Sequence, residues 1–467
     1  MIPEFAILGH PNEGKSSVVS TLTEDDKIKV SQIPGETRES KKYTITIDDK
    51  KIISFVDTPG FQVPKKTLAW FKDYKGRSDQ IIEKFIDTFK NDPFWADECE
   101  LLQPVARGAG IIYVVDGSRP VRDDDLAEME ILRLTGRPRM AIINSKTSKK
   151  NYISDWKLEF QKHFNCIREF NSNTADFNER IKMLESLKAI DQEMEDVLSH
   201  VIAAFKKERQ KRNHLVAALI SLTMEKSLSF YVSEPVTLPL DRERVKERLE
   251  KKYHTAIKKF EKLMFRKIRS LFKHTVFEYH LVEYSILRHD LFSQQTWELL
   301  GLTRQQLSTA GAVIGGSFGA VLDTAAAGMT FGVFTAVGGV IGAGSAWFGG
   351  KRMTRIKKAG IRFGKDKLKL GPNKNIQFLY ILIDRALIYY SHIINRSHGL
   401  RDRKDVLQNK ESDKKGYSTG FSSQERKICA KYFKVVIGQS FIKDKKAVSD
   451  FEELIESRLN RINKILD

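Results

Sequence analysis

The sequence predicts an α/β domain, with a mostly parallel sheet covered by helices on both faces, followed by a mainly α-helical domain. Short apolar runs alternate with helical patterns over residues 1–200. Two of these runs, 111–115 and 141–143, are continuously apolar, as in strands that are buried on both faces. Beyond residue 200 the apolar residues recur at helical spacing. We therefore expect two domains, 1–200 and 201–467.

The first domain contains six expected strands and one helical insertion. The strands cover residues 3–9, 42–48, 52–57, 110–116, 139–144 and 166–170. Residues 64–105 separate the third strand from the fourth, and their apolar side chains recur at helical spacing. This insertion either relays a change at the strand ends to a partner or only fills the fold. A long helical pattern over about 180–232 leaves the first domain.

A glycine-rich loop joins the first strand to a helical pattern and matches G-x-x-x-x-G-K-S. Such a loop between strand and helix typically binds a polyphosphate, because its backbone N–H groups point inward at the helix N-terminus. We expect Lys15 to contact the β- and γ-phosphates and Ser16 to ligate Mg²⁺. The expected nucleotide-binding residues of the loop are Gly9, Pro11, Asn12, Glu13, Gly14, Lys15, Ser16 and Ser17. The alternative is a glycine turn that matches by chance.

Two further segments have the spacing of a magnesium-dependent phosphate site. The sequence Asp57-Thr58-Pro59-Gly60 ends the apolar run 52–56. An aspartate at a strand end can hold a water on Mg²⁺, and Gly60 can donate its N–H to the γ-phosphate. Thr37, between the glycine loop and Asp57, is the expected second hydroxyl ligand of Mg²⁺. We expect Lys15, Thr37 and Gly60 to act directly in catalysis.

The motifs at 9–17, 34–39 and 57–61 resemble the Era/TrmE/EngA-like branch of translation-factor-class GTPases, over about residues 1–200. The resemblance implies binding of GTP and GDP and hydrolysis of GTP. In its potassium-activated members the loop asparagine helps to ligate K⁺, and Asn12 matches that position. Phe61 stands where Ras-like proteins keep a water-positioning glutamine, and phenylalanine cannot orient a water by hydrogen bonding. The resemblance therefore implies that K⁺, a partner or a second subunit, as in a homodimer of the GTPase domain, completes the site.

The base-recognition segment departs from the N-K-x-D pattern of these GTPases. It reads Asn144-Ser145-Lys146-Thr147, so that Asn144 fits and Lys146 can stack on the base only after a shift of one residue. A neutral threonine cannot replace the anionic acceptor, and each charge-assisted hydrogen bond lost costs on the order of 1.5–3 kcal/mol. Ser172 lies in the loop that takes the place of the usual S-A-K. We expect a guanine preference from the rest of the site, but this motif leaves guanine and adenine open.

Charge and cysteine content narrow the choice of partner and compartment. Residues 1–200 hold 30 Lys and Arg against 34 Asp and Glu, a net charge of −4. The remainder holds 49 against 26, a net charge of +23, so the C-terminal half is expected to meet anionic phospholipid or RNA. The three cysteines form no C-x-x-C pair, which predicts neither a disulfide framework nor a zinc site. The first strand begins almost at Met1, so we expect no signal peptide and a cytoplasmic location.

Residues 309–350 form a glycine-rich apolar segment. They carry one charge, Asp323, and 12 of the 29 glycines, several of which are four residues apart. Small residues at this spacing let helices pack closely, as in membranes. A hairpin that turns near 323–328 would keep the basic residues after 350 on the cytosolic side. The alternative is a glycine-packed hairpin within a protein core.

Three other segments of the C-terminal half carry predictions. An apolar stripe in a basic helix after Asp241 is expected to be core rather than a membrane surface. The apolar helix 378–394 contains Asp384 and Arg385, which favours a buried core helix over a membrane span. Residues 400–427 are charged and Gly/Ser-rich and are expected to be a flexible connection. The stripe consists of Val245, Leu249, Tyr253, Ile257, Phe260, Met264, Ile268 and Leu271.

The whole layout resembles a bacterial family of GTPases that carry a C-terminal domain of unknown function with a glycine-rich apolar stretch. The leading hypothesis is a GTP-controlled switch, assisted by K⁺, that associates with anionic lipid of the inner membrane through its C-terminal half. The alternative is an RNA- or ribosome-associated assembly GTPase without membrane insertion. The segment 309–350 favours the first hypothesis, because RNA binding gives no reason for so long an apolar stretch.

Overall fold

The computed structural model describes residues 2–24, 39–144, 152–172, 175–236, 242–273, 286–303, 306, 366–395, 416–438 and 444–463. The described chain divides into two compact units. The first unit comprises the described residues within 1–211, 270–278 and 393–403, and the second comprises the rest. The predictions for Thr37, Lys146, Thr147 and the segment 309–350 lie outside the described residues.

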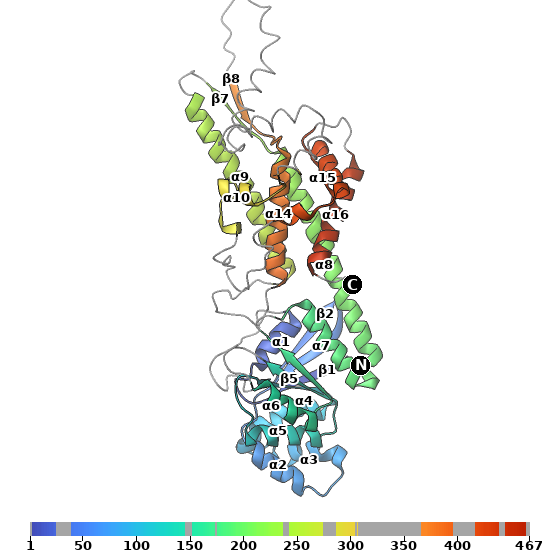
Figure 1. Cartoon of the computed structure of the whole chain (residues 1–467). Helices are drawn as coiled ribbons and strands as arrows, with labels where there is room; N and C mark the ends of the chain where they lie inside the picture. The colour runs from blue at the N-terminus through green and yellow to red at the C-terminus, as the bar shows by residue number, and fades with distance from the viewer. Residues whose placement is uncertain are drawn as a thin grey trace, which may run out of the picture. The chain divides into compact units, whose positions relative to one another are not determined.

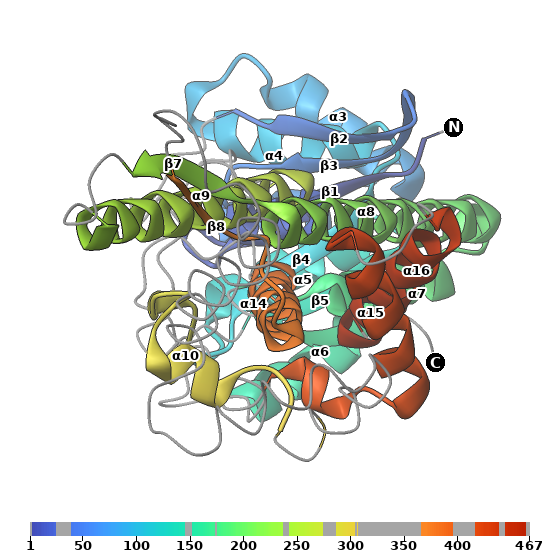
Figure 2. The ribbon, with the colours of Figure 1, turned by 90° about the horizontal axis from the view of Figure 1, so that it is seen from above.

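The first unit contains a six-stranded sheet in the order β2-β3-β1-β4-β5-β6. Neighbouring strands are parallel except for β2, which is antiparallel to β3. Figure 2 shows this order from β2 to β5. The six predicted strands are confirmed to within a few residues. Their bounds are β1 Glu4–Leu8, β2 Lys41–Ile47, β3 Lys50–Asp57, β4 Gly110–Asp116, β5 Arg139–Asn144 and β6 Cys166–Phe170.

Helices cover both faces of this sheet, as the continuous apolar runs predicted (Figure 1). Alternate strand residues point to opposite faces, so Phe5 and Ile7 pack in one core, and Ala6 and Leu8 pack in the other. The first core is closed by α1 Lys15–Thr23, α7 Phe177–Ile190 and the early part of α8 Glu195–Ser229. The second is closed by α2 Pro64–Asp73, α3 Ile81–Phe89, α4 Ala96–Ala106, α5 Asp123–Leu134 and α6 Ile153–His163.

The predicted insertion at 64–105 is helical, and its aromatic side chains pack in the second core of the sheet. It contains α2, α3 and most of α4, with short 3₁₀ turns at Ser78–Gln80 and Pro93–Trp95. The ring of Phe85 lies 5.2 Å from that of Trp70, 5.0 Å from that of Phe89 and 5.5 Å from that of Trp95, between centroids. Such aromatic contacts add stability beyond the area they bury. The insertion is therefore a packed part of the first unit.

The second unit is largely helical and includes a small sheet that the sequence patterns did not predict. Strand β7 Val232–Val236 pairs antiparallel with β8 Asp366–Leu370. The 3₁₀ turns lie at Ile286–Arg288 and Tyr417–Gly420. The helices are the later part of α8, α9 Arg242–Leu271, α10 Gln294–Leu299, α14 Ile376–Ile394, α15 Ser423–Val436 and α16 Lys445–Asn463.

Two predictions for the connections need correction. The flexible connection expected over 400–427 is wrong for its described part, because the Ser422 and Glu425 side chains form a capping box that starts α15 at Ser423. The single long helical pattern over 180–232 is two helices. It breaks at 191–194, where the Asp191 side chain caps a short 3₁₀ turn at Met194.

Both helices expected to be core are confirmed. On α9 six of the eight stripe residues are buried, and the remaining two, Phe260 and Leu271, are half-buried. On α14 the Arg385 guanidinium donates to both oxygens of Glu261, at 2.6 and 3.0 Å, so that its charge is compensated inside the unit. Within the described residues we find no helix that is both long and apolar enough to cross a membrane.

Candidate nucleotide-binding site

The glycine loop has the curled backbone that its sequence predicts. Gly9 and Gly14 have φ values of +140° and +96°, and Asn12 has a φ of +70°. A Cβ atom at Gly9 would lie 2.3 Å from the Val114 carbonyl oxygen, so no side chain fits there. Gly14 is the N-cap residue of α1, and this helix N-terminus therefore adds its positive end to the loop.

The Lys15 side chain lies inside the curl of the loop. Its Nζ donates hydrogen bonds to the carbonyl oxygens of Gly9 and His10, each at 3.0 Å. The residue is only 7% exposed. The ammonium group is thus held over the loop, where it can meet a phosphate oxygen.

Ser16 and Asp57 lie together, as the magnesium prediction requires. The Ser16 Oγ donates to Asp57 Oδ2 at 2.6 Å. Burial raises the pKa of the Asp57 carboxyl, while the Ser16 hydrogen bond and the Lys15 charge oppose that rise. The second oxygen, Oδ1, is buried and accepts no hydrogen bond among the described residues. A hydroxyl beside a carboxylate with an unused oxygen is a donor set that suits Mg²⁺.

Gly60 packs directly on the glycine loop. A Cβ atom at Gly60 would lie 2.5 Å from both N and Cδ of Pro11, so this close approach requires glycine. The next residue, Phe61, has 0% exposure and packs in the second core of the sheet. Gln62 follows, and its Nε2 donates to the Gly60 carbonyl oxygen at 3.3 Å. The segment therefore places an aromatic ring in the core at the position where Ras-like proteins keep a glutamine.

Asn144 ties together three loops at the carboxyl ends of the strands. Its Nδ2 donates to the Glu13 carbonyl oxygen at 3.1 Å, and its Oδ1 accepts from the Ser172 N–H at 3.2 Å. The Ser172 carbonyl oxygen in turn accepts from Thr21 Oγ1 at 3.3 Å. The structure thus brings Asn144 and Ser172 to the helix and loop that follow β1. A contact of Asn144 with a base remains a prediction.

An ion-pair network that the sequence patterns did not reveal holds Glu13. The Glu13 carboxylate accepts from Arg119 Nε at 2.7 Å and from the Asp116 N–H. The same Arg119 donates to both oxygens of Asp125, at 2.7 and 2.8 Å. Burial raises the pKa of Glu13, which is 3% exposed, and the Arg119 charge opposes this. The Glu13 side chain therefore braces the loop against the start of α5.

His10 forms a second contact between the glycine loop and α5. Its Nδ1 lies 3.0 Å from Glu128 Oε1, and the Tyr113 hydroxyl donates to Glu128 Oε2 at 2.8 Å. The hydrogen bond to Glu128 raises the pKa of His10, against the effect of its own burial. Glu128 has 0% exposure, and burial raises its pKa. This pairing places one end of the glycine loop against the middle of α5.

Two carboxylates of α4 hold the segment that follows Gly60 and the segment that precedes β2. Glu98 accepts through one oxygen from the N–H groups of Gln62 and Val63, at 2.8 and 2.6 Å. Glu100 accepts from the Ser40 N–H at 2.8 Å, just before β2. Neither residue carried a sequence signal, because an acidic residue in a helical pattern usually lies on a solvated face.

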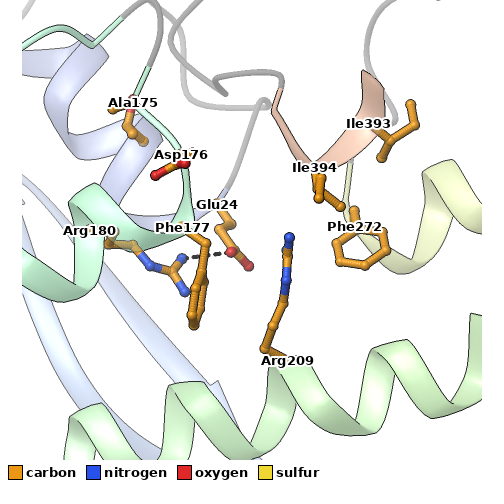
Figure 3. Close-up of a pocket in the computed structure, with 10 residues that line it drawn as sticks. Glu24, Ala175, Asp176, Phe177, Arg180, Arg209, Phe272, Ile393 and Ile394 are labelled. Carbon is orange, nitrogen blue, oxygen red and sulfur yellow. Dashed lines mark ion pairs between the residues drawn. The ribbon is translucent and has the colours of Figure 1, made fainter. Parts of the chain in front are cut away.

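A pocket lies beside the end of α1, and all of its lining residues belong to the first unit (Figure 3). Arg180 crosses it to Glu24, with 3.0 Å between NH1 and Oε1, and its guanidinium stacks over the ring of Phe205. Arg209 enters from α8 and lies over the ring of Phe272, 4.5 Å from its centroid. Because guanidinium, carboxylate and apolar groups are mixed in the lining, it indicates no one class of ligand.

Models of known protein families match both parts of the chain. The family model described as "50S ribosome-binding GTPase" matches residues 4–145. The model described as "Domain of unknown function (DUF3482)" matches residues 159–459, which is more than half of the chain. The first match covers the glycine loop, Asp57 and Gly60.

Individual relatives match only the N-terminal part of the chain. The GTPase Der of Psychrobacter cryohalolentis is 28% identical over 168 residues, which are 35% of this chain and 30% of the relative. The GTPase Der of Pseudothermotoga lettingae is 29% identical over 158 residues, 32% of this chain and 30% of the relative. The chain thus spans about a third of the length of these relatives. Among solved structures, an Era variant from Aquifex aeolicus bound to GDP and AlF4⁻ is 15% identical, with a TM-score of 0.27, over 50% of this chain and 72% of that one.

The two family matches meet in one chain without overlap. The chain therefore belongs to the family with the DUF3482 domain, and this domain follows a P-loop GTPase domain of the Era/Der class.

Proposed function

We propose that the chain is a switch that binds and hydrolyses GTP and acts at the inner membrane. The observation that carries the nucleotide part is the arrangement of Lys15 inside the curled loop with Ser16 paired to Asp57. Lys15 carries the charge that a β- or γ-phosphate needs, and the loop N–H groups and the α1 N-terminus surround the same place.

The residues at the site fit Mg²⁺. Ser16, with Thr37 from the part of the chain outside the described residues, would hold the ion, and Asp57 would hold it through water. When bound, Mg²⁺ neutralises charge on the β- and γ-phosphates. Gly60 lies on Pro11, from where its N–H can meet a γ-phosphate. Closure of the segment after Gly60 then depends on which nucleotide is bound.

A potassium ion suits the position of Asn12. Its side chain is exposed at the tip of the glycine loop, with an amide oxygen that can ligate K⁺. The buried ring of Phe61 supplies no group to orient water, so extra positive charge at the phosphates has to come from elsewhere. K⁺ at Asn12 is our proposal for its source. A second subunit, paired through the GTPase domain, is the other source that we propose to test.

The guanine preference is also a proposal. Asn144 supports it by position, because its buried side chain lies between Glu13 and Ser172 at the carboxyl end of β5. The sequence motif ends in Lys146 and Thr147 and therefore contains no anionic acceptor. Comparison of GTP and ATP binding by the full chain tests the preference. Equal affinity for the two nucleotides would contradict it.

Charge and the apolar segment support the membrane part of the proposal. The chain beyond residue 200 has a net charge of +23, and residues 309–350 carry one charge in 42. Anionic phospholipid attracts the basic part of the chain beyond residue 200, and a lipid interior suits the apolar segment 309–350. RNA is the second candidate partner, because the family model matched by the GTPase domain is described as ribosome-binding and RNA is also polyanionic.

Nucleotide turnover and flotation test the two halves of the proposal separately. The full chain should bind GTP and hydrolyse it faster in KCl than in NaCl, and Asn12→Ala should remove that difference. Lys15→Ala should abolish binding. The full chain should float with phosphatidylglycerol vesicles, and removal of 309–350 should reduce flotation. A chain that does not hydrolyse GTP contradicts the enzymatic part. A chain that stays at the bottom with vesicles but binds ribosomes or RNA contradicts the membrane part.

A further inference from the structure

One face of α9 presents basic side chains along most of its length. Positions 244, 248, 251, 255, 259, 262 and 266 follow one another at spacings of three and four, which is the spacing of a single helix face. All seven residues are exposed. One of them is Thr255. The other six are basic, and we call them the basic strip: Arg244, Arg248, Lys251, Lys259, Lys262 and Arg266. At 1.5 Å per residue the strip is about 33 Å long.

The opposite face of α9 packs in the core of the second unit. Leu249, Ile257 and Ile268 have 0% exposure, and Glu261 on that side pairs with Arg385. Turning this face toward a lipid interior would open the core of the unit. A partner of α9 therefore meets the charged face, and it has to be recognised by charge.

The positive charge of the strip is mostly uncompensated within the described residues. Arg248 pairs with Glu234 at 2.9 Å, and no ion pair or hydrogen bond involves the side chains of the other five members there. The nearest acidic positions on the helix, Glu243 and Glu247, lie on one flank at its N-terminal end. Over the whole of α9, twelve Lys and Arg stand against four Glu. Such a surface attracts a polyanion.

The aromatic residues of α9 are turned inward. Tyr253 is buried, Phe260 is half-buried, and Phe265 stacks on Tyr389 with 4.0 Å between ring centroids. Proteins that bind single-stranded RNA use exposed aromatic side chains on which bases stack. The strip has none. A straight row of cations without stacking groups suits a flat layer of phosphate headgroups, where each basic residue strengthens binding about fivefold.

The position of the strip in the fold points to the same partner. Strand β7 directly precedes α9 along the chain, and it pairs with β8, from Val232 opposite Leu370 to Val236 opposite Asp366 (Figure 1). In the sequence β8 follows the apolar segment 309–350 after 15 residues. Glu234 of β7 also holds Arg248 and Lys252 of α9. The start of α9 thus contacts β7, and β7 pairs with β8, the strand that follows the apolar segment 309–350 in the sequence.

We propose that the basic strip of α9 binds the headgroups of anionic phospholipids and holds α9 flat on the membrane surface. This inference rests on the membrane association proposed above and names the surface that makes the contact. Because the contact is electrostatic and exposed, it should weaken as salt screens it. The apolar face of α9 takes no part in it.

Co-sedimentation of the full chain with vesicles tests the strip. The vesicles contain phosphatidylcholine with or without phosphatidylglycerol. A strip variant, Lys251→Glu with Lys259→Glu and Lys262→Glu, is compared with a control that has the same change in net charge, Lys427→Glu with Lys445→Glu and Lys446→Glu. The control residues are also exposed but lie on α15 and α16. We expect the strip variant to lose on the order of 100-fold in binding to the anionic vesicles, and the control to lose far less.

Each other outcome overturns a stated part of the proposal. If the wild-type chain binds anionic vesicles and the strip variant binds them equally, the strip is not the contact, although membrane association stands. If the wild-type chain binds no vesicle, both proposals fall. If the strip variant loses binding to a fluorescent RNA but keeps binding to vesicles, the strip is an RNA surface instead. Circular dichroism of each variant verifies that these exposed substitutions leave the fold intact.

Discussion

The carboxylate of Glu98 holds the backbone N–H of Gln62 at 2.8 Å, and the same oxygen holds the N–H of Val63 at 2.6 Å. Glu98 has 0% exposure, and its other oxygen accepts no hydrogen bond among the described residues. A buried carboxylate that accepts from two consecutive amides fixes the chain strongly, since such charge-assisted hydrogen bonds are about twice as strong as neutral ones. Glu98 therefore sets the path of the chain that follows Gly60.

Replacement of Glu98 by Gln should weaken the response to the γ-phosphate. One amide oxygen cannot replace the charge that two N–H groups share, so the segment after Gly60 loses its fixed path. We expect the ratio of affinities for a non-hydrolysable GTP analogue and for GDP to fall several-fold, measured with fluorescent nucleotides. Glu100→Gln serves as the matched variant, because it loosens Ser40 but leaves Gln62 in place. A lowered melting temperature with an unchanged ratio would show that Glu98 is only structural.

Phe61→Gln should not create a faster, potassium-independent enzyme. The ring of Phe61 has 0% exposure, so a glutamine there would bury an amide without a hydrogen-bond partner and leave a cavity. We expect a loss of about 3 kcal/mol or more in the free energy of unfolding, measured by denaturant titration, and no gain in hydrolysis in NaCl. Phe61→Leu, which keeps an apolar side chain, should lose less. A stable Phe61→Gln variant with faster hydrolysis in NaCl would contradict this reading of the site.

The sequence predicted the local geometry around the glycine loop, where the signal is short-range. The loop 9–17 and the six strands along the chain follow from residue types at short spacing, and the structure places Ser16 beside Asp57 as that spacing implies. The braces could not be predicted. Glu13 meets Arg119 only because β1 and β4 are neighbours in the sheet, and no local pattern encodes a contact 106 residues away.

The small sheet of the second unit was missed for a different reason. Strand β7 reads Val-Ser-Glu-Pro-Val and β8 reads Asp-Lys-Leu-Lys-Leu, and both contain residues that are depleted in strands. Their pairing joins segments that are more than 100 residues apart. Strand propensity therefore predicts no strand in either segment. The two strands form because of their tertiary contacts.

Protonation of His10 should stabilise the first unit at acidic pH. The hydrogen bond with Glu128 raises the pKa of His10, and the charges of Glu128, Glu13 and Asp125 act in the same direction. Since the pKa is higher in the folded state, this contribution is complete below the unfolded value of about 6.5 and is lost as pH rises through the folded value.

The difference in unfolding free energy between wild type and His10→Gln, measured at several values from pH 6 to 9, should therefore decrease with rising pH. Glu128→Gln should reduce that dependence strongly, because it removes the hydrogen-bond partner of the imidazolium, the largest contribution to the raised pKa. An NMR titration of His10 that gives an ordinary pKa, or a difference that grows with pH, would contradict the prediction.

Asp384 on α14 should be a sensitive polar position of the second unit. It has 0% exposure, and it accepts from the N–H groups of Gly301 and Ser418, both at 2.7 Å, and from the Ser418 hydroxyl at 2.8 Å. An asparagine at this position would turn its NH₂ group toward one of the two backbone N–H groups in either orientation, and that N–H would lose its acceptor. We expect Asp384→Asn to cost about 1–3 kcal/mol at pH 7, and Ser418→Ala to cost less.

The pH dependence of the same group adds an independent measurement. Burial raises the pKa of Asp384 to about 6, against the effect of its three hydrogen bonds. A raised acid pKa means that the folded chain binds the proton more tightly, so the contribution of Asp384 to stability is largest below about pH 4 and falls as pH rises to about 6. The free-energy difference between wild type and Asp384→Asn should therefore shift in favour of the variant over this window. If the difference is flat from pH 4 to 7, the pKa of Asp384 is not raised, and its three hydrogen bonds fully offset the effect of burial.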